Sequence, residues 1–419
     1  MKRISIAACL VTLFVTLLPP LHAQTAQYSW VQMVDGGAEV RAIVAAGARC
    51  PKLMVNRETV EMERRPNPEN QMGGFPDTCT AKIPPKTRKL SVDGAPMPIP
   101  TTHVKRIVVI GDTGCRVTPG EHQDCTKDWP FGNIADLAAA KKPDLIIHVG
   151  DYYYREVCSN GTRHCENWRN WKLDFFDPAA PLFSAAPWVF ARGNHETCVR
   201  ASLGWFRYLD VAPAPLKCPG AKEQTFLVNL DGVTLAVIDS ADLPDAWTGD
   251  KKLASFKADI ATTHPPADTP LWIITHKPPF VQGYMKSPFD GKGEEKDPPM
   301  PNVDTIIAGH LHLFGSTTYG PDRPSQLIVG DSGTRLMVMA TKIDEMISKK
   351  DPNAMVTGKG PIDGKPAEFT MKARFGYFLL ERKSEKAKEW TGTLFGADDK
   401  PMATCKLDGR NLQCESVKL

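Results

Sequence analysis

Short apolar runs that end in a glycine and then a polar side chain recur along the chain. Four runs share this form: residues 106–112 (RIVVIGD), 145–151 (LIIHVGD), 188–194 (WVFARGN) and 305–310 (TIIAGH). A fifth run, residues 271–276 (LWIITH), ends on a histidine without the glycine. Such runs predict buried strands, and glycine at a strand end permits a sharp turn and close backbone approach. We therefore expect several strands to aim oxygen and nitrogen donors at one point, as a metal centre requires.

Helical patterns separate these predicted strands from residue 104 onward. Residues 133–142 (NIADLAAAKK), followed by Pro143, and residues 251–261 (KKLASFKADIA) predict helices. Residues 226–230 and 233–239, separated by Asp231 and Gly232, predict a β-hairpin. After His312 the pattern becomes β-like again. Strands that alternate with helices predict an α/β catalytic domain over residues 101–419.

The first hundred residues have a different character. Residues 1–26 combine Lys2 and Arg3 with a short apolar core and small residues around Ala23 and Ala26, which predicts an export signal. That core is too short for a membrane anchor, and no later segment is apolar enough to cross a membrane. Residues 27–100 show short alternating runs broken by proline and glycine. They predict a small β-rich accessory domain that ends in a stiff linker.

The cysteines support an exported protein. Ten remain once Cys9 leaves with the signal, and an even number in an exported chain predicts structural disulfides. The sequence does not determine connectivity, but nearest-neighbour pairing would give Cys50–Cys79, Cys115–Cys125, Cys158–Cys165, Cys198–Cys218 and Cys405–Cys414. A thiolate metal site is disfavoured because no CxxC spacing occurs.

The charge pattern excludes one class of partner. The formal net charge of +3 falls by two when Lys2 and Arg3 leave with the signal, and the other basic residues are scattered along the chain. A dedicated nucleic-acid surface is therefore not expected. The sequence leaves the oligomeric state open.

The residues at the predicted strand ends suit a centre with two cations. Two cations held roughly 3.5–4 Å apart need a bridging ligand, and a carboxylate suits that role. Asp151, in the central run, is the natural bridge, and Asp112 adds a second carboxylate. The remaining donors are an amide and three imidazoles, from Asn194, His276, His310 and His312. His310 and His312 are two residues apart, so in an extended segment they emerge on the same side.

These residues form five blocks that resemble a known family. The blocks GDTG (111–114), GDYYY (150–154), GNHE (193–196), ITHKPP (274–279) and GHLH (309–312), in this order, resemble the metal-binding blocks of purple acid phosphatases, which are calcineurin-like metallophosphoesterases. The resemblance covers roughly residues 104–333 and is looser beyond. It implies a four-layer α/β/β/α sandwich with metals at the carboxyl ends of the strands. The N-terminal region resembles the accessory β domain of some members.

One departure from the wider superfamily favours the purple acid branch. Most metallophosphoesterases have Asp-x-His in the first block, whereas the third position here is Gly114, which has no ligating side chain. Tyr154, three residues beyond Asp151, would replace that ligand, as GDxxY does in the purple acid branch. The resemblance then implies Fe(III) held by Asp112, Asp151, Tyr154 and His312. It implies zinc, manganese or Fe(II) held by Asp151, Asn194, His276 and His310.

The other aromatic and histidine side chains near these blocks have weaker claims. His195 matches a family position that contacts the leaving group or the phosphate oxygens, and its alternative role is to orient a metal ligand. Strand alternation places His148 on the face opposite Asp151, where a buried, hydrogen-bonded core histidine is expected. By composition Tyr152 and Tyr153 compete with Tyr154, and only the family spacing selects Tyr154.

The sequence therefore predicts an exported phosphatase that acts on small phosphate monoesters through attack of a metal-bound hydroxide. Two alternatives remain open: a phosphodiesterase or nucleotidase that uses the same centre, and a non-catalytic protein that binds metal or phosphate. The expected location is secreted or periplasmic. The short basic signal favours a bacterial periplasm, although residues 160–162 (NGT) would be a glycosylation site in a eukaryotic secretory route.

Overall fold

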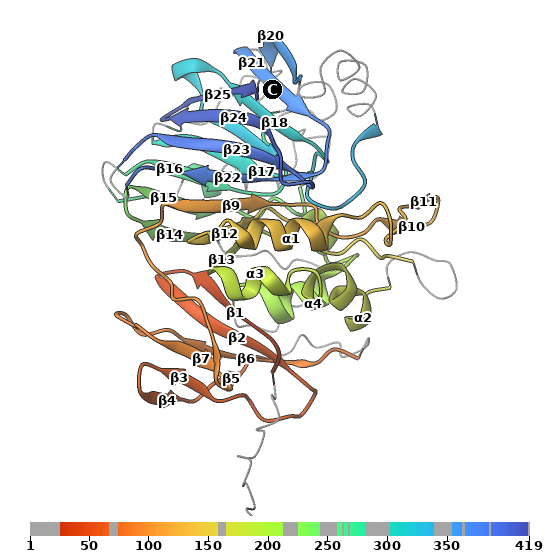
Figure 1. Cartoon of the computed structure of the whole chain (residues 1–419), viewed down its shortest axis with the longest axis vertical. Coiled ribbons are helices and arrows are strands. Elements are labelled where there is room, and N and C mark those ends of the chain that lie inside the picture. The colour runs from red at the N-terminus through yellow and green to blue at the C-terminus, as the bar shows by residue number, and fades with distance from the viewer. Residues whose placement is uncertain are drawn as a thin grey trace, which may run out of the picture.

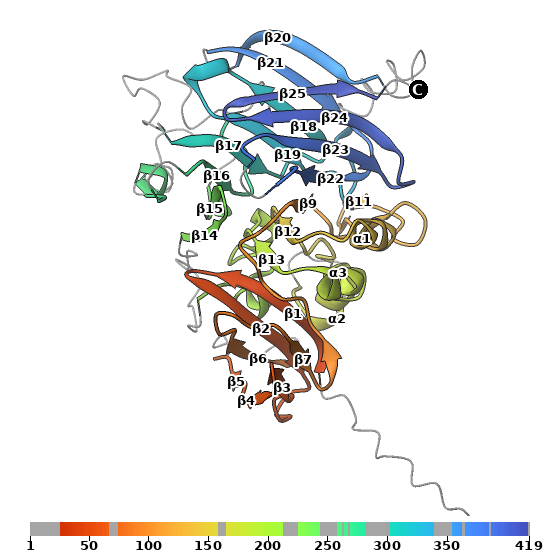
Figure 2. The same ribbon diagram turned by 60° about the vertical axis from the view of Figure 1, so that its left-hand side comes forward.

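Two large mixed β-sheets pack face to face and form the body of the molecule (Figures 1 and 2). The computed structural model describes residues 26–66, 74–157, 165–212, 225–243, 258–261, 264–266, 269–280, 300, 302–338, 354–362, 365–384 and 387–417. Residues 1–25, which hold nearly all of the predicted export signal, lie outside this part of the chain. Among the described residues, no helix has the length and apolar character needed to cross a membrane.

The larger sheet has eleven strands among the described residues. In spatial order they are β25 (Asn411–Ser416), β24 (Pro401–Asp408), β23 (Trp390–Gly396), β22 (Gly376–Glu381), β9 (Arg106–Ile110), β12 (Leu145–His148), β13 (Trp188–Phe190), β1 (Ala26–Val34), β2 (Gly37–Val44), β6 (Asp77–Lys82) and β5 (Glu63–Arg64). Its centre is parallel, since β12 pairs in parallel with both β9 and β13. Figure 1 shows the C-terminal strands at one end of this sheet and the N-terminal strands at the other.

The second sheet has eight described strands. In order they are β14 (Phe226–Leu230), β15 (Val233–Val237), β16 (Leu271–Ile274), β17 (Val303–Ala308), β19 (Ser325–Val329), β18 (Phe314–Thr318), β21 (Lys365–Lys372) and β20 (Val356–Ile362). Two small sheets contain β4 (Glu58–Val60), β3 (Leu53–Val55), β7 (Leu90–Val92) and β8 (Ala95–Pro96), and the hairpin β10 (Val117–Thr118) with β11 (Glu121–His122). β14 and β15 form the predicted hairpin.

The described helices are short. They are α1 (Phe131–Ala140), α2 (Trp168–Trp171), α3 (Ala180–Ala185), α4 (Ser202–Gly204), the π-helical turns η1 (Lys172–Phe176) and η3 (Trp205–Leu209), and the 3₁₀ turns η2 (Asn194–Glu196) and η4 (Gly320–Asp322). The predicted helix over 133–142 is thus present as α1. Of the predicted helix over 251–261, residues 258–261 are described and helical, and the rest lies outside the described part.

Strand alternation divides the core into layers. In β9, Ile107 and Val109 face the second sheet, whereas Val108 and Ile110 face α1. On the far side of the second sheet, Ile273 packs in a cluster with Ile260 of the helical residues 258–261. The order helix, sheet, sheet, helix therefore confirms the predicted four-layer sandwich.

The N-terminal strands continue the large sheet. β1 pairs in parallel with β13, with Gln32 opposite Trp188, and β2 and β6 extend the sheet beyond it. Trp30 of β1 lies against Phe176 and Phe183, with ring centroids 5.8 and 5.7 Å away. The β-rich character expected of residues 27–100 is present. The domain boundary near residue 100 stays a prediction, and the sheet crosses it.

Three of the predicted disulfides are present: Cys50–Cys79, Cys115–Cys125 and Cys405–Cys414. Cys165 and Cys198 are also disulfide-bonded. Their predicted partners, Cys158 and Cys218, lie outside the described residues. The prediction of an oxidised protein is therefore supported at every described cysteine of the mature chain.

Candidate metal centre

The carboxyl ends of five strands converge between the two sheets. β9, β12 and β13 of the larger sheet lead to Asp112, Asp151 and Asn194. β16 and β17 of the second sheet lead to His276 and His310. Backbone hydrogen bonds tie the strand ends together: the Asp112 N–H donates to Gly150 O (2.9 Å), and the Gly309 N–H donates to His276 O (3.0 Å). All five predicted blocks therefore meet at one point.

Unusual backbone turns aim the side chains inward. Asp112, Asp151 and His310 have φ angles of 54°, 62° and 69°. This left-handed region is uncommon outside glycine, and Asp and His tolerate it better than most residues. At position 150, where φ is 102°, only glycine fits, because a Cβ there would lie 2.5 Å from His276 Nδ1. Glycine before the aspartate is thus needed for the close approach of His276.

Asp151 occupies the middle of the centre. It is shared by two groups whose candidate ligand atoms all lie within 4.8 Å of one another: Asp151 with His276 and His310, and Asp151 with Asp112 and His312. Asp151 Oδ2 lies 3.2 Å from His276 Nε2. A carboxylate between two groups of donors occupies the position that a ligand shared by two cations would need.

Tyr154 is the one member of the tyrosine triplet whose hydroxyl reaches this centre. Its OH lies 2.8 Å from Asp151 Oδ2, 3.3 Å from Asp112 Oδ1 and 3.0 Å from His312 Nε2. The hydroxyls of Tyr152 and Tyr153 instead donate to the carbonyls of residues 191 and 165.

Gly114 makes room for Tyr154. A Cβ at position 114 would lie 2.9 Å from Tyr154 Cδ2 and 2.6 Å from the Tyr152 carbonyl. Glycine at position 114 therefore accounts for two features: the position offers no metal ligand, and the Tyr154 phenol has room to reach the centre.

The histidines present lone pairs to the centre. His276 Nδ1–H donates to Val149 O and His312 Nδ1–H donates to Arg335 O, each at 2.8 Å. Their Nε2 atoms therefore carry no proton in the neutral ring and can bind a cation. Asn194 Oδ1 and His310 Nδ1 lie 3.0 and 3.2 Å from His276 Nε2. These atoms are the remaining donors that the sequence predicts.

The electrostatics fit cations at this position. Burial, and then the charge of Asp151, raise the pKa of Asp112 well above its usual range. Burial also opposes ionisation of Asp151, but the imidazoles around it, His276 foremost, outweigh burial and hold its pKa well below the usual range. Two buried carboxylates and a phenol in contact are stable together as anions only if positive charge lies between them. The donor set therefore fits two metal ions.

His195 lies beside the donors. Its side chain is 4% exposed, and its ring packs on Tyr154 with centroids 3.7 Å apart. Nδ1 lies 2.9 Å from Glu156 Oε1, and Glu156 in turn accepts from Arg200 Nε (2.7 Å). Nε2 lies 3.8 Å from Asp151 Oδ2. Burial lowers the pKa of His195, and the carboxylates of Asp151 and Glu156 oppose that shift.

The family can now be assigned. The family profile described as "Calcineurin-like phosphoesterase" matches residues 105–314, which is half of the chain. The chain belongs to the calcineurin-like phosphoesterase family. Members of this family bind two metal ions. The family predicted from the five blocks is therefore confirmed.

Known proteins of this family show how far the likeness extends. Purple acid phosphatase 23 of Arabidopsis thaliana is 24% identical over 282 residues, which are 60% of this chain and 58% of that protein. The chain thus matches less than two thirds of the relative's length. The structure of purple acid phosphatase PPD1 from yellow lupin (Lupinus luteus) seeds superposes with a TM-score of 0.54 and 14% identity, over 94% of this chain and 74% of that one.

A second solved structure, titled PhoD, gives a TM-score of 0.51 and 11% identity, over 96% of this chain and 94% of that one. At these identities the two structures show a shared fold. Together with the family profile they confirm the predicted fold class.

Two buried carboxylates support the centre of this phosphoesterase from outside. Glu196 accepts backbone N–H groups of Asp151, Tyr152, Tyr153 and residue 193, at 2.9 to 3.1 Å. Asp174 of η1 accepts those of Tyr154, residue 155 and Cys115, at 2.8 to 3.2 Å. Glu196 thereby ties its own turn to the segment that carries Asp151. The sequence carries no signal for the second, because Asp174 lies in an aromatic helical segment.

Two other polar residues lie at or just after a strand end without joining the donor set. His148 is fully buried, as predicted, and its Nε2 lies 2.9 Å from Thr113 Oγ1. Asp331 follows β19 in another glycine-aspartate pair, yet neither carboxylate oxygen has a hydrogen-bond partner among the described residues. The strand-glycine-aspartate pattern by itself therefore does not identify a metal ligand.

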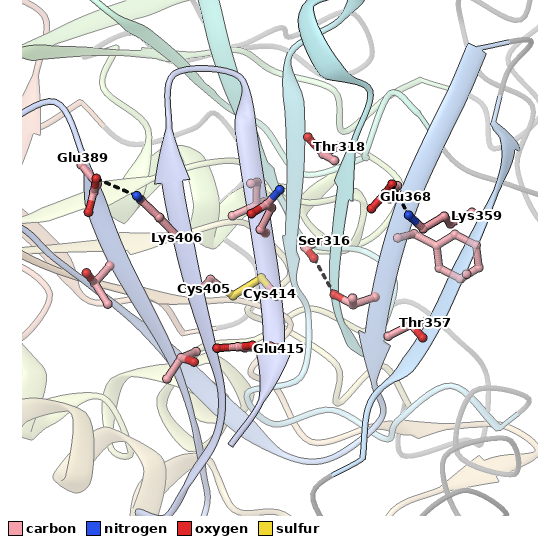
Figure 3. Close-up of a pocket in the computed structure, with 17 residues that line it drawn as sticks. Ser316, Thr318, Thr357, Lys359, Glu368, Glu389, Cys405, Lys406, Cys414 and Glu415 are labelled. Carbon is pink, nitrogen blue, oxygen red and sulfur yellow. Dashed lines mark hydrogen bonds and ion pairs between the residues drawn. A yellow bond between two sulfur atoms is a disulfide. The ribbon is translucent and has the colours of Figure 1, made fainter. Parts of the chain in front are cut away.

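A separate cleft of about 810 Å³ opens between β18, β20 and β21 and the strands β23 to β25 (Figure 3). Hydroxyl side chains line it, together with the ion pairs Lys406–Glu389 (3.0 Å) and Lys359–Glu368 (2.5 Å). None of the eight predicted site residues is among its lining residues. This cleft therefore shares no residue with the candidate metal centre.

Proposed function

We propose that this protein is a two-metal phosphatase that hydrolyses phosphate monoesters. The observation that carries the proposal is the shared position of Asp151 between two donor groups, with the Tyr154 hydroxyl on the side of Asp112 and His312. A purple acid phosphatase among the relatives supports this branch of the family.

The donor chemistry supports different metals on the two sides. Asp112, Tyr154 and His312, with Asp151, offer hard anionic oxygens and one imidazole, which suit Fe(III). Asn194, His276 and His310, with Asp151, offer an amide oxygen and two imidazoles, which suit zinc, manganese or Fe(II).

The side chains then divide the work of hydrolysis. The bound cations would supply an activated water and neutralise charge on the phosphoryl oxygens. Tyr154, packed under His195, fixes the plane of the imidazole, and Glu156 holds Nδ1. Nε2 is then the atom that can pass a proton to the departing oxygen, and the Glu156 carboxylate stabilises the imidazolium that this step requires. Glu196 keeps Asp151 in place by its backbone contacts.

Export is part of the proposal. Three disulfides and two further bonded cysteines support an oxidising compartment, because disulfides persist there and are rare in the cytosol. We infer a secreted or periplasmic enzyme that acts on small phosphate esters.

Turnover of p-nitrophenyl phosphate by protein loaded with iron and zinc, compared with bis-p-nitrophenyl phosphate, tests the function. We expect the monoester to be the better substrate and Asp151→Asn to be inactive. Better turnover of the diester would favour a phosphodiesterase, and no turnover under any metal loading would favour a binding protein. We expect segments 158–183 and 281–303 to shape the substrate pocket that separates monoesters from diesters. Residues 158–164, 281–299 and 301 of these segments lie outside the described part of the chain.

His195→Ala tests the catalytic part of the proposal. We expect both metals to remain bound, as measured by metal analysis, while kcat falls by about 10²–10⁴-fold, as is typical for loss of a general acid or base. Loss of a metal with the histidine would show instead that His195 orients a ligand.

A further inference from the structure

Two arginines border the metal centre, and their side chains have no part in the proposed hydrolysis. Arg116 precedes β10, and its Cζ lies 5.7 Å from the centroid of the Tyr154 ring. Arg335 follows β19, and its backbone carbonyl accepts the hydrogen bond from His312 Nδ1 (2.8 Å). Both residues therefore stand on the Tyr154–His312 side of the centre.

A buried glutamine fixes the two segments relative to each other. Gln123 is 5% exposed, and its Nε2 donates to Gly333 O (3.0 Å) in the loop that carries Arg335. Its Oε1 accepts from the Arg116 N–H (3.1 Å), and its own N–H donates to Arg116 O (2.8 Å). The backbones of both arginines are thus held at one edge of the centre by the same side chain.

The positive charge of the two guanidinium groups is only partly neutralised by nearby carboxylates. Arg116 pairs with Glu121, whose side chain is 49% exposed. The Arg335 side chain is exposed and forms no ion pair with any residue that the structure describes. An exposed ion pair contributes little to stability, so a stronger anion can displace Glu121 from Arg116.

Glu121 is influenced by both arginine side chains. The hydrogen bond from Arg116 lowers the pKa of Glu121, and the charges of Arg116 and Arg335 lower it further. Both arginines therefore act on the same carboxylate.

We propose that Arg116 and Arg335 bind a second anionic group of the substrate, so that the preferred substrates are phosphate monoesters that also carry another phosphate or a carboxylate. This inference rests on the proposed phosphatase function. The reacting phosphate lies at the metal donors, so guanidinium groups beyond Tyr154 remain available for another anion. Arginine suits that role because its planar fork pairs with phosphate and carboxylate through two hydrogen bonds.

The decisive experiment compares two substrates that differ by one phosphate. Steady-state KM and kcat are measured for glucose 1,6-bisphosphate and glucose 6-phosphate, with wild type, Arg335→Gln, Arg116→Gln and Glu121→Gln. The wild type should have a KM about tenfold lower for the bisphosphate. Arg335→Gln should remove most of that advantage and leave kcat and the KM for the monophosphate unchanged. Glu121→Gln, which removes the competing carboxylate, should lower the KM for the bisphosphate further.

Control variants separate this proposal from simpler effects. Arg57→Gln removes an exposed arginine from the turn between β3 and β4 and should change neither KM. Equal KM values for the two substrates in the wild type would overturn the proposal. An equal rise of both KM values in Arg335→Gln would overturn it too, because it would show general attraction of phosphate. Absence of turnover of p-nitrophenyl phosphate would instead overturn the proposed function, and this inference with it.

Discussion

Three consecutive tyrosines follow one aspartate, and their hydroxyls go to three different places. Only Tyr154 contacts Asp112, Asp151 and His312, whereas Tyr152 and Tyr153 bind backbone carbonyls. The difference follows from position, since Tyr154 packs against the space that Gly114 leaves free.

Tyr154→Phe should abolish the visible colour of the iron-loaded protein, because a phenolate bound to Fe(III) gives a charge-transfer band. Tyr152→Phe and Tyr153→Phe should keep the band, and they are the matched controls. Absorption spectra of the three variants at equal iron content check this. A colourless wild type, or a band that survives without Tyr154, would contradict the assignment of the first metal.

Asp331 gives the molecule a measurable pH dependence of stability. Burial raises the pKa of this carboxyl to about 8 from 3.8. The folded state therefore holds a proton that the unfolded state loses between these values, and stability falls as pH rises through that window. Asp331→Asn should match the wild type near pH 4 and exceed it by a few kcal/mol near pH 8, at about 1.4 kcal/mol for each pKa unit.

Urea unfolding at a series of pH values measures this difference. The exposed Asp136→Asn in α1 is the control and should follow the wild type at every pH. A difference between Asp331→Asn and wild type that does not grow with pH would show that the carboxyl is ionised in the folded protein.

At the scale of elements, the strand ends are held by side chains from other segments. Glu196, in the turn after β13, accepts four backbone N–H groups that include the three residues from Asp151 to Tyr153. Glu196→Ala should leave these buried donors without a partner, at a cost of about 1–3 kcal/mol for each such group. We expect a lower melting temperature and weaker metal binding. Glu381→Ala, at the exposed end of β22, should change neither.

The sequence predicted the elements that position the donors because their signals are local. A strand, a glycine and a ligand lie within seven residues, and α1 begins and ends within two residues of the prediction. The structure places all eight predicted site residues in one cluster. Their roles as ligands stay predictions until metal is bound and measured.

The supporting residues were not predictable, because their positions depend on contacts between distant segments. Glu156 and Asp174 act on the centre through His195 and the backbone of Tyr154, and neither lies in a recognisable motif. Asp331 shows the converse, since it has the motif of a ligand and belongs to neither group of candidate ligand atoms. The parallel pairing of β1 with β13 joins residues more than 150 positions apart, and hydrophobic patterns carry no register over such a distance.

At the scale of the whole molecule, the N-terminal strands close the edge of the catalytic sheet. β1 covers β13, and Trp30 packs with the aromatic helical segment. Expression of residues 101–419 alone should give aggregated protein, because β13 would become an exposed, apolar edge strand. The same protein with residues 26–100 retained is the control, and soluble yield with size-exclusion chromatography is the measurement. A soluble fragment that unfolds cooperatively would instead support a separable accessory domain.

The left-handed backbone of Asp112, Asp151 and His310 sets a limit on engineering this protein for heat resistance. A side chain in that region costs on the order of 1 kcal/mol relative to glycine, and the adjoining buried carboxylates add to the cost. Laboratory evolution that screens for thermostability alone would therefore select glycine at these positions and lose the candidate metal-binding side chains. Such an experiment has to select for turnover and melting temperature in the same round, because substitutions that stabilise the fold at these positions would remove the residues needed for activity.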